Sequence, residues 1–200
     1  MSFMRLRKLL LPILLALALT ACGTAAAPRE PAVMADLSLY PASDMSGFAA
    51  LANHEGELAY RDVSVADVDK MMSEGESFVL LCAYPGCPWC ELLVEPLNAA
   101  AERAGVQVAF INTRRDPSWK SNLDMEDYDL FVELFGEYLD EDEQGRPHLY
   151  VPDVYVVRNG EVAGRRDGVL AGLEDPATPM TDEQRATLDS ELDALLDALG

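Results

Sequence analysis

The four residues of this 200-residue chain that are best suited to chemistry are Cys87-Pro88-Trp89-Cys90. Two thiols at this spacing can close a disulfide or open it again, which is two-electron thiol–disulfide exchange. A continuous apolar run, Phe78 to Ala83, comes before them, and a long pattern of helical spacing follows. We therefore expect the dithiol to lie at the end of a strand buried on both faces, where a helix begins.

The start of this helix predicts different roles for the two thiols. Pro88 suits the first helical turn, because the N–H that proline lacks would have no partner there. Cys87 then faces the free N–H groups and the positive end of the helix dipole, which favour a thiolate, so Cys87 is the predicted nucleophile. Cys90, one turn into the helix, is predicted to be buried and protonated and to act as the resolving thiol. We expect neither a cofactor nor a metal at these residues.

Other interpretations of the motif stay open. A zinc site would need more ligands, but the chain has no second Cys-x-x-Cys, and His54 and His148 lie far away in sequence. A structural disulfide would close only a very short loop and would gain little entropy from it. Delivery of a metal such as copper by the dithiol is compatible with an exported protein. Cys82, inside the apolar run, is predicted to be a core thiol without redox function.

The first 21 residues have the pattern of a signal peptide: a basic start, then an apolar stretch from Leu9 to Leu19. This stretch is too short to span a bilayer, which needs about 20 apolar residues. It ends on Leu19-Thr20-Ala21-Cys22, which resembles the lipobox of bacterial lipoproteins. The resemblance implies that residues 1–21 are removed and that Cys22 is lipidated. The chain would then be anchored to a bacterial membrane on the extracytoplasmic side, in the cell envelope. An ordinary signal peptide with an incidental cysteine is the alternative.

The rest of the chain divides into a tether and a domain. Residues 22–35 are small, contain proline and lack an apolar period, so they are predicted to be a flexible lipidated tether. Residues 36–200 have the length and apolar content of one domain. The formal net charge of −20 argues against nucleic-acid binding and fits solubility at a surface or a basic partner. Nothing in the sequence indicates an oligomeric state.

Strand and helix patterns alternate along this domain. Ser64 with Asp67, and Thr181 with Gln184, have the spacing of helix capping boxes. Asn159-Gly160 predicts a two-residue hairpin turn. The expected strands are 58–63, 78–83, 106–112, 154–158 and 161–165, and the expected helices follow Ser64, Cys87 and Thr181, with one more amphipathic helix inside the acidic stretch 113–150.

The buried strand, the dithiol at a helix start, Val151-Pro152 before a later strand and the Asn-Gly hairpin together resemble the thioredoxin superfamily. The resemblance implies an α/β, thioredoxin-like fold: a central mixed sheet flanked by helices, with a helical insertion at about 113–150 before a cis-proline strand. It also implies that the Val151-Pro152 bond is cis and lies against the dithiol. Val151, Pro152, Pro88 and Trp89 would then bind the partner protein.

The same resemblance implies a thiol–disulfide oxidoreductase that acts on the thiols and disulfides of partner proteins, with the direction of electron flow left open. Within the superfamily, the chain is loosely similar to exported thioredoxin-like proteins and their transporter-accessory relatives. One departure concerns proton transfer: the family carries a buried acid where this chain has Leu81, so no carboxylate is expected beside Cys90. The rival function is a non-catalytic accessory or binding lipoprotein that docks through the acidic stretch 113–150.

Overall fold

The computed structural model describes residues 30–114 and 127–200, and a compact unit runs from Pro31 to Gly200. This unit includes the last residues of the predicted tether, 31–35. Cys22, the predicted signal peptide and residues 115–126 of the predicted insertion lie outside the described residues. Among the described residues, no helix combines the length and the apolar character needed to cross a membrane.

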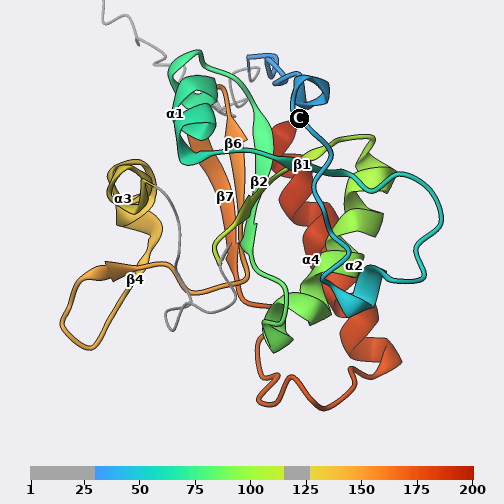
Figure 1. Cartoon of the computed structure of the whole chain (residues 1–200). Coiled ribbons are helices and arrows are strands. Elements are labelled where there is room, and N and C mark those ends of the chain that lie inside the picture. Colours follow the sequence, from blue (N-terminus) through green and yellow to red (C-terminus); the bar gives the residue numbers. More distant parts are fainter. Residues whose placement is uncertain (1–29, 115–126) are drawn as a thin grey trace, which may run out of the picture. The chain divides into compact units, whose positions relative to one another are not determined.

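A five-stranded mixed sheet forms the centre of this unit (Figure 1). Its strands run in the order β1-β3-β2-β6-β7. The first three of these are parallel to one another, β6 is antiparallel to β2, and β7 is antiparallel to β6. Their bounds are Tyr60–Asp62 for β1, Phe78–Ala83 for β2, Val108–Asn112 for β3, Asp153–Arg158 for β6 and Glu161–Asp167 for β7.

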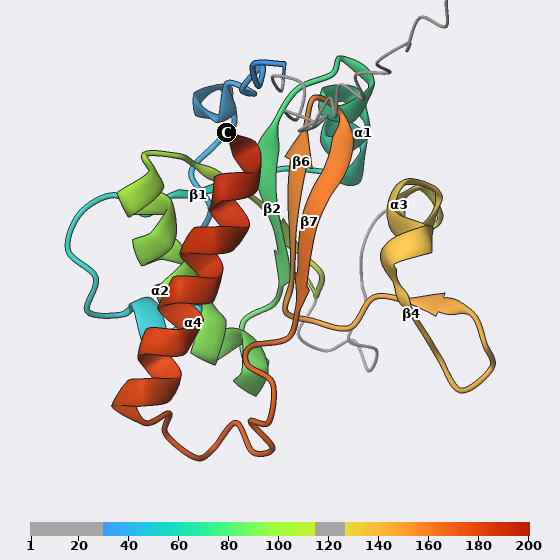
Figure 2. The same cartoon turned by 180° about the vertical axis from the view of Figure 1, so that it is seen from behind.

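Helices cover both faces of the sheet. Helices α2 (Pro88–Ala104) and α4 (Asp182–Leu196) lie on one face, and α1 (Val65–Ser73) and α3 (Tyr128–Phe135) lie on the other, as the view from behind also shows (Figure 2). Short 3-10 helices are formed by Leu37–Leu39, Ala49–Leu51, Gly136–Tyr138 and Asp197–Leu199. The arrangement confirms the predicted α/β class with a central mixed sheet flanked by helices.

Strand β2 separates the two halves of the core. All six of its residues are buried, and its side chains alternate between the two faces of the sheet. Leu81 and Ala83 pack with Cys87 and Cys90 on the face covered by α2 and α4. Cys82 packs on the opposite face and is fully buried, so it lies away from the dithiol.

The predicted capping boxes form at both helices. The Ser64 hydroxyl accepts a hydrogen bond from the backbone N–H of Asp67, and Thr181 does the same for Gln184. Each cap satisfies N–H groups that have no partner within the first helical turn. Helix α4 then buries Leu188, Leu192 and Leu196 at helical spacing, as its apolar stripe predicted.

The predicted insertion contains a helix and also a small hairpin that the sequence analysis missed. Helix α3 packs on the sheet through Phe131 and Phe135, and the ring centroids of Phe135 and Tyr155 are 4.5 Å apart. A two-stranded hairpin follows, formed by β4 (Asp140–Glu141) and β5 (Pro147–His148). The four adjacent acids at 140–143, expected as a solvated loop, therefore supply one strand and the start of a turn.

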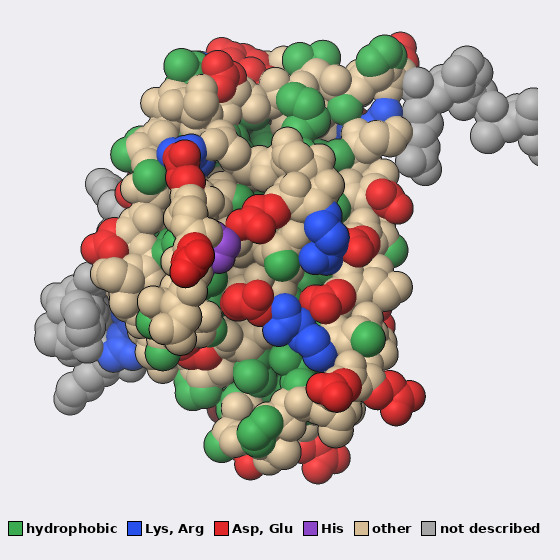
Figure 3. Space-filling model, turned by 90° about the vertical axis from the view of Figure 1, so that its right-hand side faces the viewer, with side chains coloured by type: hydrophobic (Ala, Val, Ile, Leu, Met, Phe, Trp, Pro, Cys, Tyr) green, Lys and Arg blue, Asp and Glu red, His purple; other side chains and the backbone are tan. Residues whose placement is uncertain are grey.

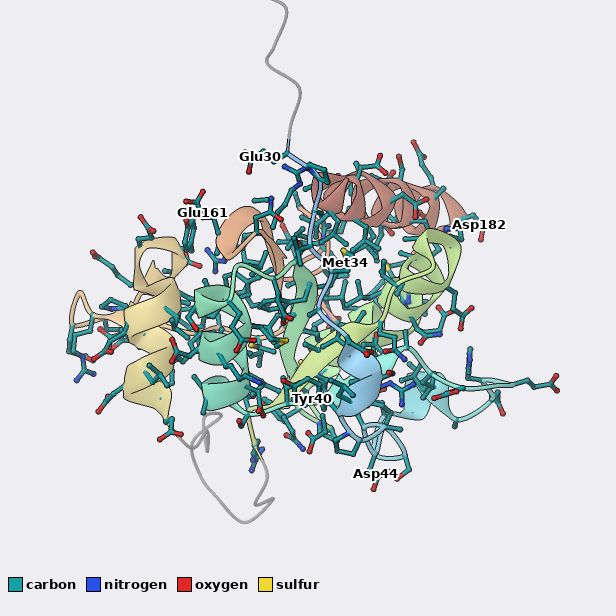
Figure 4. The ribbon with its side chains drawn as sticks, turned by 90° about the horizontal axis from the view of Figure 1, so that it is seen from above. Glu30, Met34, Tyr40, Asp44, Glu161 and Asp182 are labelled. Carbon is teal, nitrogen blue, oxygen red and sulfur yellow. The ribbon has the colours of Figure 1, made fainter. Side chains whose placement is uncertain are left out.

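The start of the unit is held at one end of the sheet. The backbone N–H of Ser77, just before β2, donates to the carbonyl of Val33 (2.6 Å), and the N–H of Ala35 donates back to Ser77 (2.9 Å). The N–H of Val33 also donates to the Asn159 side chain in the β6–β7 turn (3.1 Å). Seen from above, Met34 lies over this end of the sheet (Figure 4). The dithiol lies at the other end of β2.

Arg165 on β7 joins the sheet to the insertion. Its guanidinium donates to both carboxylate oxygens of the fully buried Asp153 (2.9 to 3.1 Å), and also to Asp140 and to the backbone carbonyl of Tyr138. The Tyr155 hydroxyl donates to the same Asp153 carboxylate (2.6 Å). Burial raises the pKa of Asp153 to about 6, although the hydrogen bonds from Arg165 and Tyr155 oppose this. Asp153 directly follows Pro152, so this ion pair lies next to the Val151-Pro152 bond.

We expect Arg165→Met to lower the free energy of unfolding by about 3 kcal/mol at pH 8, because it leaves the buried Asp153 carboxylate without its counterion. The loss should be smaller at pH 5, where that carboxyl group is protonated in the folded variant and needs no counterion. Urea unfolding at the two pH values measures both effects.

The matched control is Arg103→Met, which breaks the half-exposed ion pair between Arg103 and Asp193. This change should cost less than about 1 kcal/mol at either pH. Equal losses in the two variants would contradict the importance given to the pair of Arg165 and Asp153.

Candidate active site

Cys87 lies where β2 ends and α2 begins. The chain leaves β2 at Ala83 and turns through Gly86, whose φ of +85° is in the region that favours glycine. Cys87 is the N-cap of α2 with extended backbone angles, and Pro88 occupies the first turn as predicted. The turn therefore places one thiol at the N-terminus of the helix and the other one turn further along it.

The two thiols are hydrogen-bonded but differ in their surroundings. The Cys87 sulfur accepts the backbone N–H of Cys90 at 3.3 Å. Cys87 keeps a small exposed fraction of 4%, whereas Cys90 is fully buried. Both are free thiols in the structure. A partner molecule can thus reach Cys87 first.

Their pKa values are shifted in opposite directions. A hydrogen bond from the Cys90 thiol is the largest cause that lowers the pKa of Cys87 to about 7, and the backbone N–H groups of Cys90 and Trp89 add to it. Burial raises the pKa of Cys90 far above its usual range, and the hydrogen bond to Cys87 raises it further. Near neutral pH Cys87 is thus partly a thiolate while Cys90 stays protonated, and the two shifts have the directions that the helix start predicts.

The Val151-Pro152 bond is cis, as the family resemblance implied. It lies against the dithiol: the Cys87 sulfur is 3.8 Å from the backbone carbonyl oxygen of Val151. The carbonyl of Pro152 accepts the N–H of Gly168, just after β7 (2.9 Å). Residues separated by more than 60 positions in the sequence are thus brought together at the thiol.

A groove of about 890 Å³ runs beside this bond. Three of the four residues predicted to bind a partner, Trp89, Val151 and Pro152, line it, and Pro88 does not, although Pro88 is exposed next to Cys87. The remaining wall of the groove was not predicted. Most of it is close in sequence to Pro152 or to the end of β7, but Asp140 and Glu191 come from other segments. The missed residues include Tyr150, Arg165, Arg166, Asp167, Leu170 and Leu173.

The buried acid that the family resemblance places on the strand before the dithiol is replaced here by a leucine. Leu81 occupies the β2 position that faces the dithiol. The fully buried Asp153 hydrogen-bonds to Arg165 and Tyr155, and Tyr155 packs on the other face of the sheet. The negative charge of Glu91 raises the pKa of both thiols. Among the described residues Glu91 is thus the carboxylate that acts on Cys90, and it already accepts the backbone N–H of Ala50 (3.0 Å).

Alkylation by iodoacetamide tests the pKa difference. In the reduced protein we expect Cys87 to react at a rate that rises with pH and is half-maximal near pH 7, while Cys90 stays unmodified in the folded state. Cys90→Ala removes the thiol that donates to Cys87, so the midpoint should move to higher pH. Peptide mass spectrometry identifies the modified cysteine, and an unchanged midpoint in Cys90→Ala would contradict this origin of the lowered pKa.

No protein-family profile and no curated protein matches the chain. Solved structures similar to it include a thioredoxin from Trypanosoma brucei brucei, with 16% identity, a TM-score of 0.41, and coverage of 72% of this chain and 96% of that one. Thioredoxin O2 from Arabidopsis thaliana in the oxidised state is another, with 11% identity, a TM-score of 0.40, and coverage of 68% and 94%. The assignment rests on the chain's own geometry. The strand order, the helix that starts at a dithiol and the adjacent cis-proline show that the described domain has a thioredoxin-like fold.

Proposed function

We propose that this protein is a membrane-anchored, extracytoplasmic thiol–disulfide oxidoreductase whose redox group is the pair Cys87 and Cys90. The observation that carries the proposal is the asymmetry of the two thiols. Cys87 is slightly exposed at the start of a helix and has a pKa lowered to about 7, while Cys90 is buried and protonated. A purely structural disulfide needs neither a stabilised thiolate nor a groove beside it.

The reaction has two exchange steps. The Cys87 thiolate attacks one sulfur of a partner disulfide, which breaks the partner's S–S bond, forms a mixed disulfide and releases the other partner sulfur as a thiolate. Cys90 then loses its proton and attacks the Cys87 sulfur, so that the bond between Cys87 and Cys90 forms and the second partner thiolate leaves. The partner gains two electrons and the dithiol loses two. Oxidation of a partner dithiol is the same sequence in reverse.

The second step needs an acceptor for the Cys90 proton. The thiolate released in the first step, or water entering the groove, is suited to this task because Leu81 replaces the acid that the family carries.

The location is proposed from the sequence alone. Cleavage before Cys22 and lipidation of its thiol would hold the domain on the outer side of a bacterial membrane. Partner disulfides in this compartment form under oxidising conditions. The reduction potential of the dithiol decides the direction: a value near −270 mV is typical of a reductant such as thioredoxin, and one near −120 mV of a strong oxidant.

Reduction of insulin disulfides by dithiothreitol tests the activity. We expect the described domain to accelerate the reaction, and Cys87→Ser to abolish the acceleration because the attacking sulfur is gone. Cys90→Ser should instead accumulate a mixed disulfide at Cys87, since the resolving step is lost, and mass spectrometry of the unreduced protein detects it.

The matched control is Cys82→Ala, which removes a buried thiol on the other face of the sheet. This variant should keep the activity of the parent domain. Equal activity in Cys87→Ser and the parent would overturn the proposal and favour a non-catalytic accessory protein.

A further inference from the structure

We propose that the groove beside Pro152 selects partner segments that carry a lysine or arginine close to the reacting cysteine, and that Asp167 pairs with this basic side chain. The inference rests on the proposed function, because it names the class of substrate that reaches Cys87. It adds a residue that determines specificity and does not take part in the exchange of electrons.

The basic side chains of the groove are already neutralised by acids of the same domain. Arg165 is paired with Asp153 and with Asp140. Arg166 is paired with Glu191 of α4 (2.8 Å) and also donates to the carbonyl of Val169. The ion pairs of both guanidinium groups therefore hold the walls of the groove together. The Nε of Arg166 has no hydrogen-bond partner among the described residues, but it is buried, so it is poorly placed to attract an acidic partner.

Asp167 differs from these groups. It is the exposed last residue of β7, and its carboxylate has no hydrogen bond or ion pair with any residue in the part of the chain that the structure describes. It lines the groove, and the next residue, Gly168, donates its N–H to the carbonyl of Pro152. A negative charge without a partner thus lies close to the bond that packs against Cys87.

The rest of the groove favours an apolar segment around this charge. Trp89, Leu170 and Leu173 line it, and so does Tyr150, whose exposed fraction of 50% is high for a large apolar side chain. Helix α2 begins at the lower end of the molecule in Figure 1. On the side that Figure 3 shows, acidic side chains are spread over the whole height of the molecule, in keeping with the net charge of −20. The lining of the groove thus complements a segment with apolar residues and a basic one.

The size of the effect follows from the exposure of Asp167. An ion pair at a solvent-exposed site changes an equilibrium or a rate by about twofold to fivefold, and salt weakens it. The preference should therefore be modest, reduced at high ionic strength, and expressed in the bimolecular rate constant with which Cys87 attacks a partner disulfide.

Two homodimeric peptide disulfides provide the test: one with lysine on both sides of its single cysteine, and one with glutamine at the same positions. Each is mixed with the reduced domain, and chromatography follows the release of free peptide. We expect the domain to react about twofold to fivefold faster with the lysine peptide at low salt, and Asp167→Asn to bring the ratio of the two rates close to one.

The matched control is Glu161→Gln, which removes the same charge from the exposed first residue of β7, at the opposite end of the strand (Figure 4). This variant should keep the preference for lysine. A ratio of the two rates near one in the parent domain would overturn the role of Asp167. An equal loss of preference in both variants would also overturn it, because net charge alone would then explain the preference. Failure of both peptides to react would instead refute the proposed function.

Discussion

The hydrogen bond that the Cys87 sulfur accepts from the backbone of Cys90 is the interaction on which the candidate site depends. It exists because Cys87 is the N-cap of α2, a position in which a side chain meets N–H groups that have no partner in the helix. The position in turn requires that β2 end at Ala83 and that Gly86 allow the turn. Burial of all of β2 between two layers of helices fixes where this end lies. The chemistry of one sulfur thus follows from the packing of the whole sheet.

The surroundings of the thiol come from distant parts of the chain. The Val151-Pro152 bond and the end of β7 meet at the groove, and α4 contributes Glu191 to its wall. Arg165 connects these parts with the insertion, since it binds the buried Asp153, Asp140 and the carbonyl of Tyr138. A buried ion pair adds little net stability compared with apolar packing, but the loss of one partner is costly. The pair therefore fixes the relative positions of the insertion and the strand after Pro152.

Much of the fold could be predicted from the sequence because its signals are local. The apolar run of β2, the capping residues Ser64 and Thr181, and the Asn159-Gly160 turn each act within a few residues, and each element appears where it was expected. The different surroundings of Cys87 and Cys90 were also accessible, since the helix start determines them. The pair of Arg165 and Asp153 and the groove residue Leu170 could not be found in this way. Their importance arises from contacts between segments that only the tertiary structure brings together.

The start of the domain lies at the end of the sheet remote from the dithiol, where Val33 and Ala35 hydrogen-bond to Ser77. The six residues of β2 lie between that point and the turn that leads to Cys87, a length of about 20 Å. A lipid anchor on Cys22, as proposed, would therefore be connected to the domain at the end of the sheet remote from the reactive sulfur, so that the tether and the length of β2 would both separate this sulfur from the bilayer. Polypeptides diffusing through the envelope would then meet the thiolate more readily than disulfides embedded at the lipid surface, so the attachment point itself would bias which partners are oxidised or reduced.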